Sequence, residues 1–242
     1  MKKPFIIETI NRPKSHVTKW HSHQECQLFI LKSGLISFEF KEQKIIIPAG
    51  HAGWIPAGIV HKAKIIGSAD AIFLYFDARV CKLLPQHVFV FSTTSLIQEI
   101  IARFVTVNNG KWSSADNNLM HVLLNEIKSA NATPLSLPMP NDKNMALVAK
   151  KFISDPAVNE SIEYWSILAH MSKRTFTRNF RLQTGMSFAK WCQQARVMRS
   201  LEYLSQDKQV SWIAFTLGYN SVSAFIKVFK QWLGKTPKQY FD

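Results

Sequence analysis

The chain contains one local pattern twice, as SKRTFTRNFRLQTGMS at residues 172–187 and as SVSAFIKVFKQWLGKT at residues 221–236. In each copy a serine is followed by two phenylalanines four residues apart and then by a glycine. A serine hydroxyl can accept hydrogen bonds from the first N–H groups of a helix, residues four apart share a helical face, and glycine suits the backbone that ends a helix. Each copy is therefore predicted to be one amphipathic helix.

A shorter helical pattern precedes each copy, at residues 162–166 and 210–214. Each of these patterns ends on a small residue that is followed four positions later by a turn residue, His170 or Gly218. A small residue and a turn at this spacing suit two helices that cross closely at a sharp angle. The chain is therefore predicted to contain two helix-turn-helix units.

Ser187 can cap a further helix that runs between the two units to about Ser205. About 18 helical residues would span roughly 27 Å. Because successive major grooves on one side of B-DNA are about 34 Å apart, this helix could hold two recognition helices in adjacent grooves. A single chain would then read a bipartite site.

The outward positions of the two long helices carry the candidate DNA contacts. Arginine can pair bidentately with guanine edges, whereas lysine mainly holds phosphates. The candidates are Lys173, Arg174, Thr177, Arg178 and Arg181 in the first unit, and Asn220, Ser223, Ile226 and Lys227 in the second. The second set is more apolar and less charged, so stronger base readout is expected from the first unit. A solvated basic face on an ordinary helical bundle is the alternative, which the matching caps, aromatics and glycines disfavour.

The stretch from Ser161 to Tyr240 resembles the DNA-binding domain of AraC/XylS-type transcriptional regulators. Both copies carry the resemblance, together with IAFTLGYN before the second copy and Arg196 between them. It implies a seven-helix domain whose helices near 173–184 and 222–233 enter the major groove. By motif position the base-facing residues are Arg174, Thr177 and Arg178 in the first unit, and Ser223, Ile226 and Lys227 in the second. His170 departs from the glycine usual in the family, but histidine can adopt a left-handed backbone at some cost.

Composition agrees with an anionic partner. The 242 residues carry a formal net charge of +14, and residues 141–242 contain 15 Lys or Arg against 7 Asp or Glu. Basic charge alone would also suit solubility or a membrane surface, so only the motif points to double-stranded promoter DNA. No stretch approaches 18 apolar residues and no signal-peptide core follows the start. A cytoplasmic protein without a membrane partner is therefore expected.

Three cysteines, Cys26, Cys81 and Cys192, are odd in number, widely separated and without CxxC spacing. Such a pattern predicts neither a disulfide framework nor a zinc site. All three are expected to be reduced and mostly buried, with a redox-sensing cysteine as the alternative.

Short β-rich runs with regular turn residues dominate the sequence from Cys26 to about Phe76, which predicts a small antiparallel barrel or jelly roll. Within it, His21-x-His23-x₃-Gln27-x₆-Gly34 and Gly50-x₅-Pro56-x-Gly58-x₂-His61 resemble the two motifs of the cupin superfamily. Gln27 stands where metal-binding cupins have glutamate, and Ile65 stands where the second motif has asparagine. Since His21 and His23 point the same way in a strand, they can converge with His61 on one point.

Two interpretations of these histidines stay open. Three imidazoles could hold a divalent metal with Gln27 as a neutral fourth ligand, or the same groups could line a polar ligand pocket. The candidate effector-binding residues are His21, His23, Gln27, Trp54 and His61. Beyond this possible metal no cofactor is expected. No nucleophile or paired carboxylates accompany the histidines, so an enzyme is not predicted; a cupin oxygenase fused to a DNA-binding module is the alternative.

Helical patterns at about 94–107 and 113–130 follow the barrel, and one apolar face of this pair is expected to cover it. The remaining apolar surface either forms a dimer seam or packs within the same domain. Three prolines in NATPLSLPMPNDK indicate a semi-stiff linker.

The sequence thus predicts an α+β protein of two domains, a cupin-like β-barrel with a helical hairpin and an all-α double helix-turn-helix domain. The predicted boundaries are 1–85 for the barrel, 86–130 for the hairpin, 131–143 for the linker and 144–242 for the DNA-binding domain. The resemblance implies a small-molecule effector. A homodimer is expected on repeated or inverted promoter sites, with RNA polymerase as a further partner if the protein activates transcription.

Overall fold

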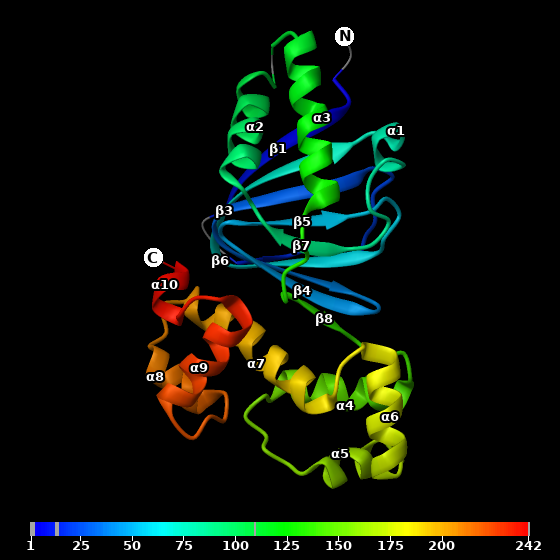
Figure 1. Ribbon diagram of the computed structural model, residues 1–242, viewed down its shortest axis with the longest axis vertical. Helices are drawn as coiled ribbons and strands as arrows, with labels where there is room; N and C mark the ends of the chain where they lie inside the picture. The colour runs from blue at the N-terminus through cyan, green and yellow to red at the C-terminus, as the bar shows by residue number, and fades with distance from the viewer. Residues whose placement is uncertain (1–2, 13–14, 109, 242) are drawn as a thin grey trace. The chain divides into compact units, whose positions relative to one another are not determined.

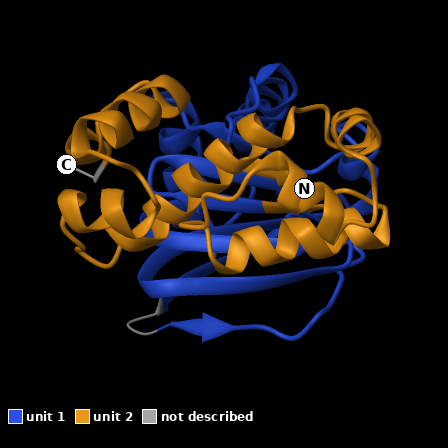
Figure 2. Cartoon of the chain, turned by 90° about the horizontal axis from the view of Figure 1, so that it is seen from below, with its two compact units in different colours: residues 1–40, 45–135 blue, residues 41–44, 136–242 orange. Residues whose placement is uncertain are grey.

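The computed structural model describes residues 3–12, 15–108 and 110–241. The chain forms two compact units, one made of residues 1–40 and 45–135 and the other of residues 41–44 and 136–242 (Figure 2). The first unit is rich in strands and the second in helices, so the predicted α+β class with two domains is confirmed.

Antiparallel strands build the first unit. They are β1 (Phe5–Arg12), β2 (His16–Val17), β3 (Cys26–Phe40), β4 (Gln43–Pro48), β5 (His51–Ile55), β6 (His61–Phe76) and β7 (Phe89–Ser92). β6 pairs with β1, β2 and β3, and β5 pairs with β3 and β7. Gly34, the last residue of the first cupin-like motif, lies at an irregularity within β3, where the register with β6 shifts on both sides of Ser33. Gly34 has a φ of 85°, and a Cβ there would lie 2.1 Å from the Ser68 oxygen, so only glycine lets the long strand continue.

Helices α2 (Ser95–Thr106) and α3 (Ser114–Ser129) form the predicted hairpin (Figure 1). Their apolar residues join one buried cluster with alternate residues of the sheet. The cluster includes Leu28, Trp54 and Leu74 from the strands and Ile100, Phe104, Leu123 and Ile127 from the helices. The hairpin therefore covers one face of the sheet.

The opposite side chains of the same strands form an aromatic interior. Phe29 and Phe38 are fully buried with ring centroids 4.5 Å apart, and Phe73 stacks at 5.8 Å from Phe29. These rings fill this part of the interior of the first unit.

The prediction of three reduced cysteines is wrong. Cys26 and Cys81 form a disulfide, and only Cys192 is a free, buried thiol. Cys26 begins β3 opposite Phe76 of β6, and Cys81 ends the one-turn helix α1 (Ala78–Cys81) that follows β6. Strand pairing thus brings together two residues that are 55 positions apart.

The second unit contains seven helices among the residues that the structure describes, as the resemblance implies. They are α4 (Lys143–Ser154), α5 (Ile162–Leu168), α6 (Lys173–Thr184), α7 (Phe188–Leu204), α8 (Val210–Thr216), α9 (Val222–Leu233) and α10 (Pro237–Phe241). The segment predicted as a linker includes the short strand β8 (Ser136–Pro138). Within this unit β8 is bound to α7, since the Trp191 indole donates to the Pro138 oxygen at 2.6 Å and the Gln194 amide donates to the Ser136 oxygen at 2.9 Å.

The helix ends follow the predicted capping residues. Ser161, Ser172, Ser187 and Ser221 each accept a hydrogen bond from a backbone N–H in the first turn of the helix that follows. Gly185 and Gly234 have left-handed φ values of 73° and 76°. His170 is also left-handed, with φ of 55°, so the first turn is kept despite its departure from glycine. No described helix combines the length and apolar character that a membrane crossing needs.

Candidate functional site

Two helix-turn-helix units of equal dimensions lie in the second unit of the chain. α5 and α8 each have seven residues, and α6 and α9 each have twelve. The 17-residue helix α7, about 26 Å long, lies between the two pairs (Figure 1). The tertiary structure therefore preserves the duplication that the sequence shows.

The first long helix, α6, has one buried side and one basic side. Phe176 and Phe180 are fully buried, whereas the five predicted contact residues, Lys173, Arg174, Thr177, Arg178 and Arg181, are all exposed. Four of them line a cleft of about 1120 Å³ beside α5 and α7, namely Arg174, Thr177, Arg178 and Arg181. Burial of the aromatic side thus fixes which way the arginines face.

Three of the five α6 residues already have hydrogen-bond partners within the unit. The Lys173 ammonium lies 2.5 Å from the Glu163 carboxylate of α5, and this hydrogen bond holds the pKa of Glu163 below its usual value. The Thr177 hydroxyl donates to the Lys173 backbone oxygen at 2.9 Å. The Arg178 Nε donates to the Asn179 Oδ1 at 3.4 Å, a longer contact than those of Lys173 and Thr177.

The second long helix, α9, repeats this division with weaker charge. Phe225 and Phe229 are fully buried. Of the four predicted residues, Asn220, Ser223 and Lys227 are exposed and Ile226 is half-buried. The structure brings each predicted set onto one side of its helix, with a strongly basic first set.

Arg196 of α7 is a positioning residue that side-chain periodicity alone did not identify. Its guanidinium donates to the backbone oxygens of Pro156 at 2.8 Å and Val158 at 3.3 Å. It also lies over the rings of Phe152 at 5.3 Å and Tyr219 at 5.8 Å. Pro156 and Val158 lie between α4 and α5, and Tyr219 precedes α9, so Arg196 joins α7 to the segments that lead into the two helix-turn-helix units.

The first unit brings His21, His23 and His61 together. The backbones of His21 and His61 exchange hydrogen bonds at 2.8 and 2.9 Å, and His23 lies two residues from His21. The ring centroids are 4.5 to 5.3 Å apart, and one nitrogen of each ring lies within 4.8 Å of those of the other two. His61 is buried while His21 and His23 are half-buried, so the cluster opens on one side.

Backbone contacts determine which nitrogens of this cluster are available. The Nδ1 atoms of His21 and His61 lie 2.8 and 2.9 Å from the backbone oxygens of Lys19 and Ile59. A carbonyl only accepts, so each Nδ1 carries the proton and each Nε2 of a neutral ring presents a lone pair. Burial lowers the pKa of His61 to about 4 and lowers that of His23, and the nearby His21 acts in the same direction. The rings of His23 and His61 are therefore neutral at pH 7.

Gln27 supplies an oxygen to the same region. Its side chain is 3% exposed, and its Oε1 has no hydrogen-bond partner. Gln27 pairs in register with Tyr75, whose ring lies 5.3 Å from that of His23. A buried acceptor without a partner costs about 1–3 kcal/mol, which favours a ligand at this position. Three imidazoles, two of them with preset tautomers, and one amide oxygen fit a divalent transition metal.

Trp54, the remaining candidate for effector binding, does not join the histidines. Its register partner on β3 is Leu28, so its side chain faces the α2–α3 cluster and not the side of Gln27. The indole is fully buried and donates to the Pro85 oxygen at 2.8 Å. The structure thus places Trp54 in the packing under the hairpin.

Comparisons with known proteins agree with this architecture. A family model described as a helix-turn-helix domain matches residues 165–242, and one described as an AraC-like ligand-binding domain matches residues 7–91. The HTH-type transcriptional regulator NimR of Escherichia coli is 27% identical over 221 residues, which cover 91% of this chain and 81% of that protein. RipA of Corynebacterium glutamicum is 30% identical over 103 residues, or 43% of this chain and 31% of that protein.

Among solved structures, ToxT from Vibrio cholerae covers 99% of this chain at 13% identity and a TM-score of 0.42, with 98% of its own chain matched. The two matched domains and the duplicated helix-turn-helix define a DNA-binding regulator of transcription. The chain belongs to the AraC-type regulators, with an N-terminal AraC-like ligand-binding domain. It is a transcriptional regulator and not an enzyme, so the oxygenase alternative is not retained.

Proposed function

We propose that this regulator binds specific promoter sequences as a homodimer, with α6 and α9 of each chain in adjacent major grooves. The observation that carries the proposal is the duplication of helix-turn-helix units at the two ends of α7, each with its aromatic side buried and its polar side exposed. The length of α7 supports a spacing close to one helical turn of DNA.

The division of roles follows from side-chain chemistry. Arg174 and Arg178 read base edges, with Thr177 beside them, while Lys173 and Arg181 hold phosphates. In the second unit Ser223 and Ile226 contact bases, and Asn220 and Lys227 approach the backbone. Sequence preference is therefore stronger in the half-site that α6 reads.

The effector site is the region of His21, His23, Gln27 and His61, where we place a divalent transition metal. The Nε2 atoms of His21 and His61, a nitrogen of His23 and the Gln27 oxygen would hold the ion. When bound, it supplies a positive charge that can attract an anionic small molecule. The lowered pKa of His61 and the hydrogen bonds to the Lys19 and Ile59 oxygens support neutral, oriented ligands.

The α2–α3 hairpin would form the interface of the homodimer. Leu96 of α2 and Val122 of α3 remain 48% and 39% exposed, although most of the apolar stripe is buried within the unit. Effector binding would change the arrangement of the two DNA-binding units, and a regulator that activates would then contact RNA polymerase.

Footprinting of the full chain on its own upstream DNA, with excess unrelated duplex, tests DNA recognition. Two protected segments about one helical turn apart are expected. Arg174→Ala should weaken cognate binding by about 1–3 kcal/mol, roughly 5- to 150-fold, and relax preference at one base pair. Lys173→Ala is the matched control, since it should weaken all sequences evenly and by less. Unchanged base preference in the arginine variant would assign Arg174 to phosphate contact.

Metal binding is tested on tag-free protein that has been dialysed against chelator. Titration calorimetry with Zn²⁺, Mn²⁺ and Ni²⁺ should give one site per chain, which His61→Asn abolishes and Gln27→Leu weakens. His121→Asn changes an exposed histidine of α3 and should leave the titration unchanged. Equal binding by the His61 and His121 variants would show that the cluster holds no metal and would leave it as a polar ligand pocket.

A further inference from the structure

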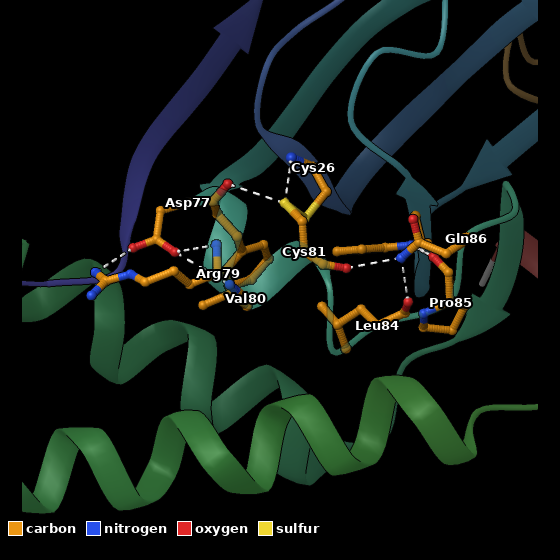
Figure 3. Close-up of a disulfide and its surroundings, with 10 residues drawn as sticks. Cys26, Asp77, Arg79, Val80, Cys81, Leu84, Pro85 and Gln86 are labelled. Carbon is orange, nitrogen blue, oxygen red and sulfur yellow. Dashed lines mark hydrogen bonds and ion pairs between the residues drawn. A yellow bond between two sulfur atoms is a disulfide. The ribbon is translucent and has the colours of Figure 1, made fainter.

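We infer that Cys26 and Cys81 form a reversible thiol–disulfide modification site, through which a hydroperoxide oxidant and a dithiol reductant act on the ligand-binding unit. Figure 3 shows the bond between the first residue of β3 and the end of α1. The two Cα atoms are 5.7 Å apart, a separation that is ordinary for a disulfide. The inference concerns regulation, and it rests on the proposed function for its output.

The disulfide holds down a short connecting segment between β6 and β7. α1 is a single turn of four residues, and its start is held by the Asp77 carboxylate, which accepts from the N–H groups of Arg79 and Val80. At its end the Gln86 amide donates to the backbone oxygens of Cys81 and Leu84 (Figure 3). Leu83 is 56% exposed, whereas Val80 and Leu84 are buried in the cluster beneath the hairpin, so noncovalent packing also holds this turn. The covalent bond is the strongest tie that α1 has to β3.

The two sulfur atoms are unequal. Cys26 is fully buried in β3, whereas Cys81 is 7% exposed and lies on the segment that can open. The backbone N–H of Cys26 donates to the Cys81 sulfur at 3.0 Å. This N–H is placed to donate to the Cys81 sulfur when the bond is open as well. Cys81 is therefore the reactive sulfur and Cys26 the resolving one.

A hydroperoxide can form the disulfide, and a dithiol can reduce it. In oxidation, the Cys81 thiolate attacks a hydroperoxide oxygen and the O–O bond breaks, which gives a sulfenic acid and an alcohol or water after protonation. The Cys26 thiol then displaces the sulfenic oxygen as water and forms the S–S bond. In reduction, one thiolate of the dithiol attacks the Cys81 sulfur and the Cys26 thiolate leaves and is protonated. The second thiol of the reductant then closes its own disulfide and releases the Cys81 thiolate.

The position of the disulfide couples it to both parts of the ligand-binding unit. Cys26 precedes Gln27, the residue with the unpaired oxygen beside the histidines, and both sulfurs lie in the cluster that packs under α2 and α3. When the bond opens, α1 loses its covalent link to the start of β3 and is held only by its noncovalent contacts in that cluster. The thiol state thereby changes the geometry that the effector and the dimer require.

Full-length protein is tested in oxidised and reduced form. Maleimide labelling after denaturation should modify one thiol, Cys192, in peroxide-treated protein and three after a dithiol, through repeated cycles. DNA binding to the footprinted site should differ between the two forms by about fivefold or more in Kd. Cys81→Ser should remove this difference, and Cys26→Ala provides a second variant if the first does not fold. The Cys192→Ala protein should retain the difference in Kd between the oxidised and reduced forms.

Three labelled thiols after peroxide treatment would overturn the modification site. Cycling without any change in Kd would overturn its regulatory role and leave the DNA-binding proposal intact. Cycling with no specific DNA binding in either form would refute the proposed function and, with it, the regulatory output of the disulfide, while the modification site itself would stand.

Discussion

Opening the Cys26–Cys81 disulfide is expected to destabilise the ligand-binding unit by about 4 kcal/mol. The bond joins residues 55 positions apart. In the chain-entropy description, a cross-link over a loop of this length removes about 14 cal/mol/K from the unfolded chain, which is about 4 kcal/mol at 25 °C. The folded state should change less, because both sulfurs stay within the same buried cluster. For a unit of this size, a loss of this magnitude lowers Tm by on the order of 10 °C.

Hydrogen exchange measured by mass spectrometry separates the two units, which a single fluorescence transition does not, since both units contain tryptophan. With a dithiol present, amides of β3 and β6 should exchange faster, while those of α7 should keep their protection. The Cys81→Ser protein should resemble the reduced wild type, and adding reductant to it should have no effect. A change below about 1 kcal/mol in the opening free energy of the β3 amides would refute the chain-entropy reasoning, and so would an equal change for the α7 amides.

Further predictions concern the helical unit and the histidine cluster. Gly218→Ala should destabilise the helical unit by more than about 2 kcal/mol in thermal unfolding, because φ is 79° and a Cβ would lie 2.6 Å from the Ala157 oxygen. Gly185→Ala, at φ of 73° with open space around it, should cost only about 1–2 kcal/mol, and equal losses would exclude the close approach as the cause. The pKa of His61 is lowered in the folded protein from 6.5 to about 4, so protons bind the unfolded chain first as the pH falls. The free energy of unfolding of the metal-free protein should therefore fall by up to about 3 kcal/mol between pH 6.5 and 4. In urea titrations, His61→Asn should reduce this pH dependence. Arg196→Met should weaken DNA binding at both half-sites together while retaining helix content by circular dichroism, and loss at one half-site alone would limit its role to one unit.

Much of the helical unit follows from local sequence. A serine cap, two phenylalanines one turn apart and a terminal glycine act within a dozen residues, so the pattern at 172–187 determines α6 without distant partners. The histidine cluster was also foreseeable, because the cupin-like spacing groups His21, His23 and His61. The strand expected at His21 and His23 is reduced to an isolated bridge between His21 and His61. The DNA and effector contacts themselves stay predictions.

The pairing of the strands determines two features that the sequence alone does not predict, the disulfide and the orientation of Trp54. Cys26 and Cys81 offer no spacing motif, and they meet only because Cys26 pairs opposite Phe76, five residues before Cys81. Trp54 looked like a ligand contact by composition, yet its register partner Leu28 turns it toward the hairpin.

The sequence by itself thus determined the helices, their caps and the basic sides of α6 and α9, because helical hydrogen bonds and caps join residues that are close in the chain. Only the tertiary structure decided the disulfide, the side that Trp54 faces and the unpaired oxygen of Gln27. Those features depend on the register between strands that are distant in sequence, where a shift of one residue turns every side chain to the opposite face.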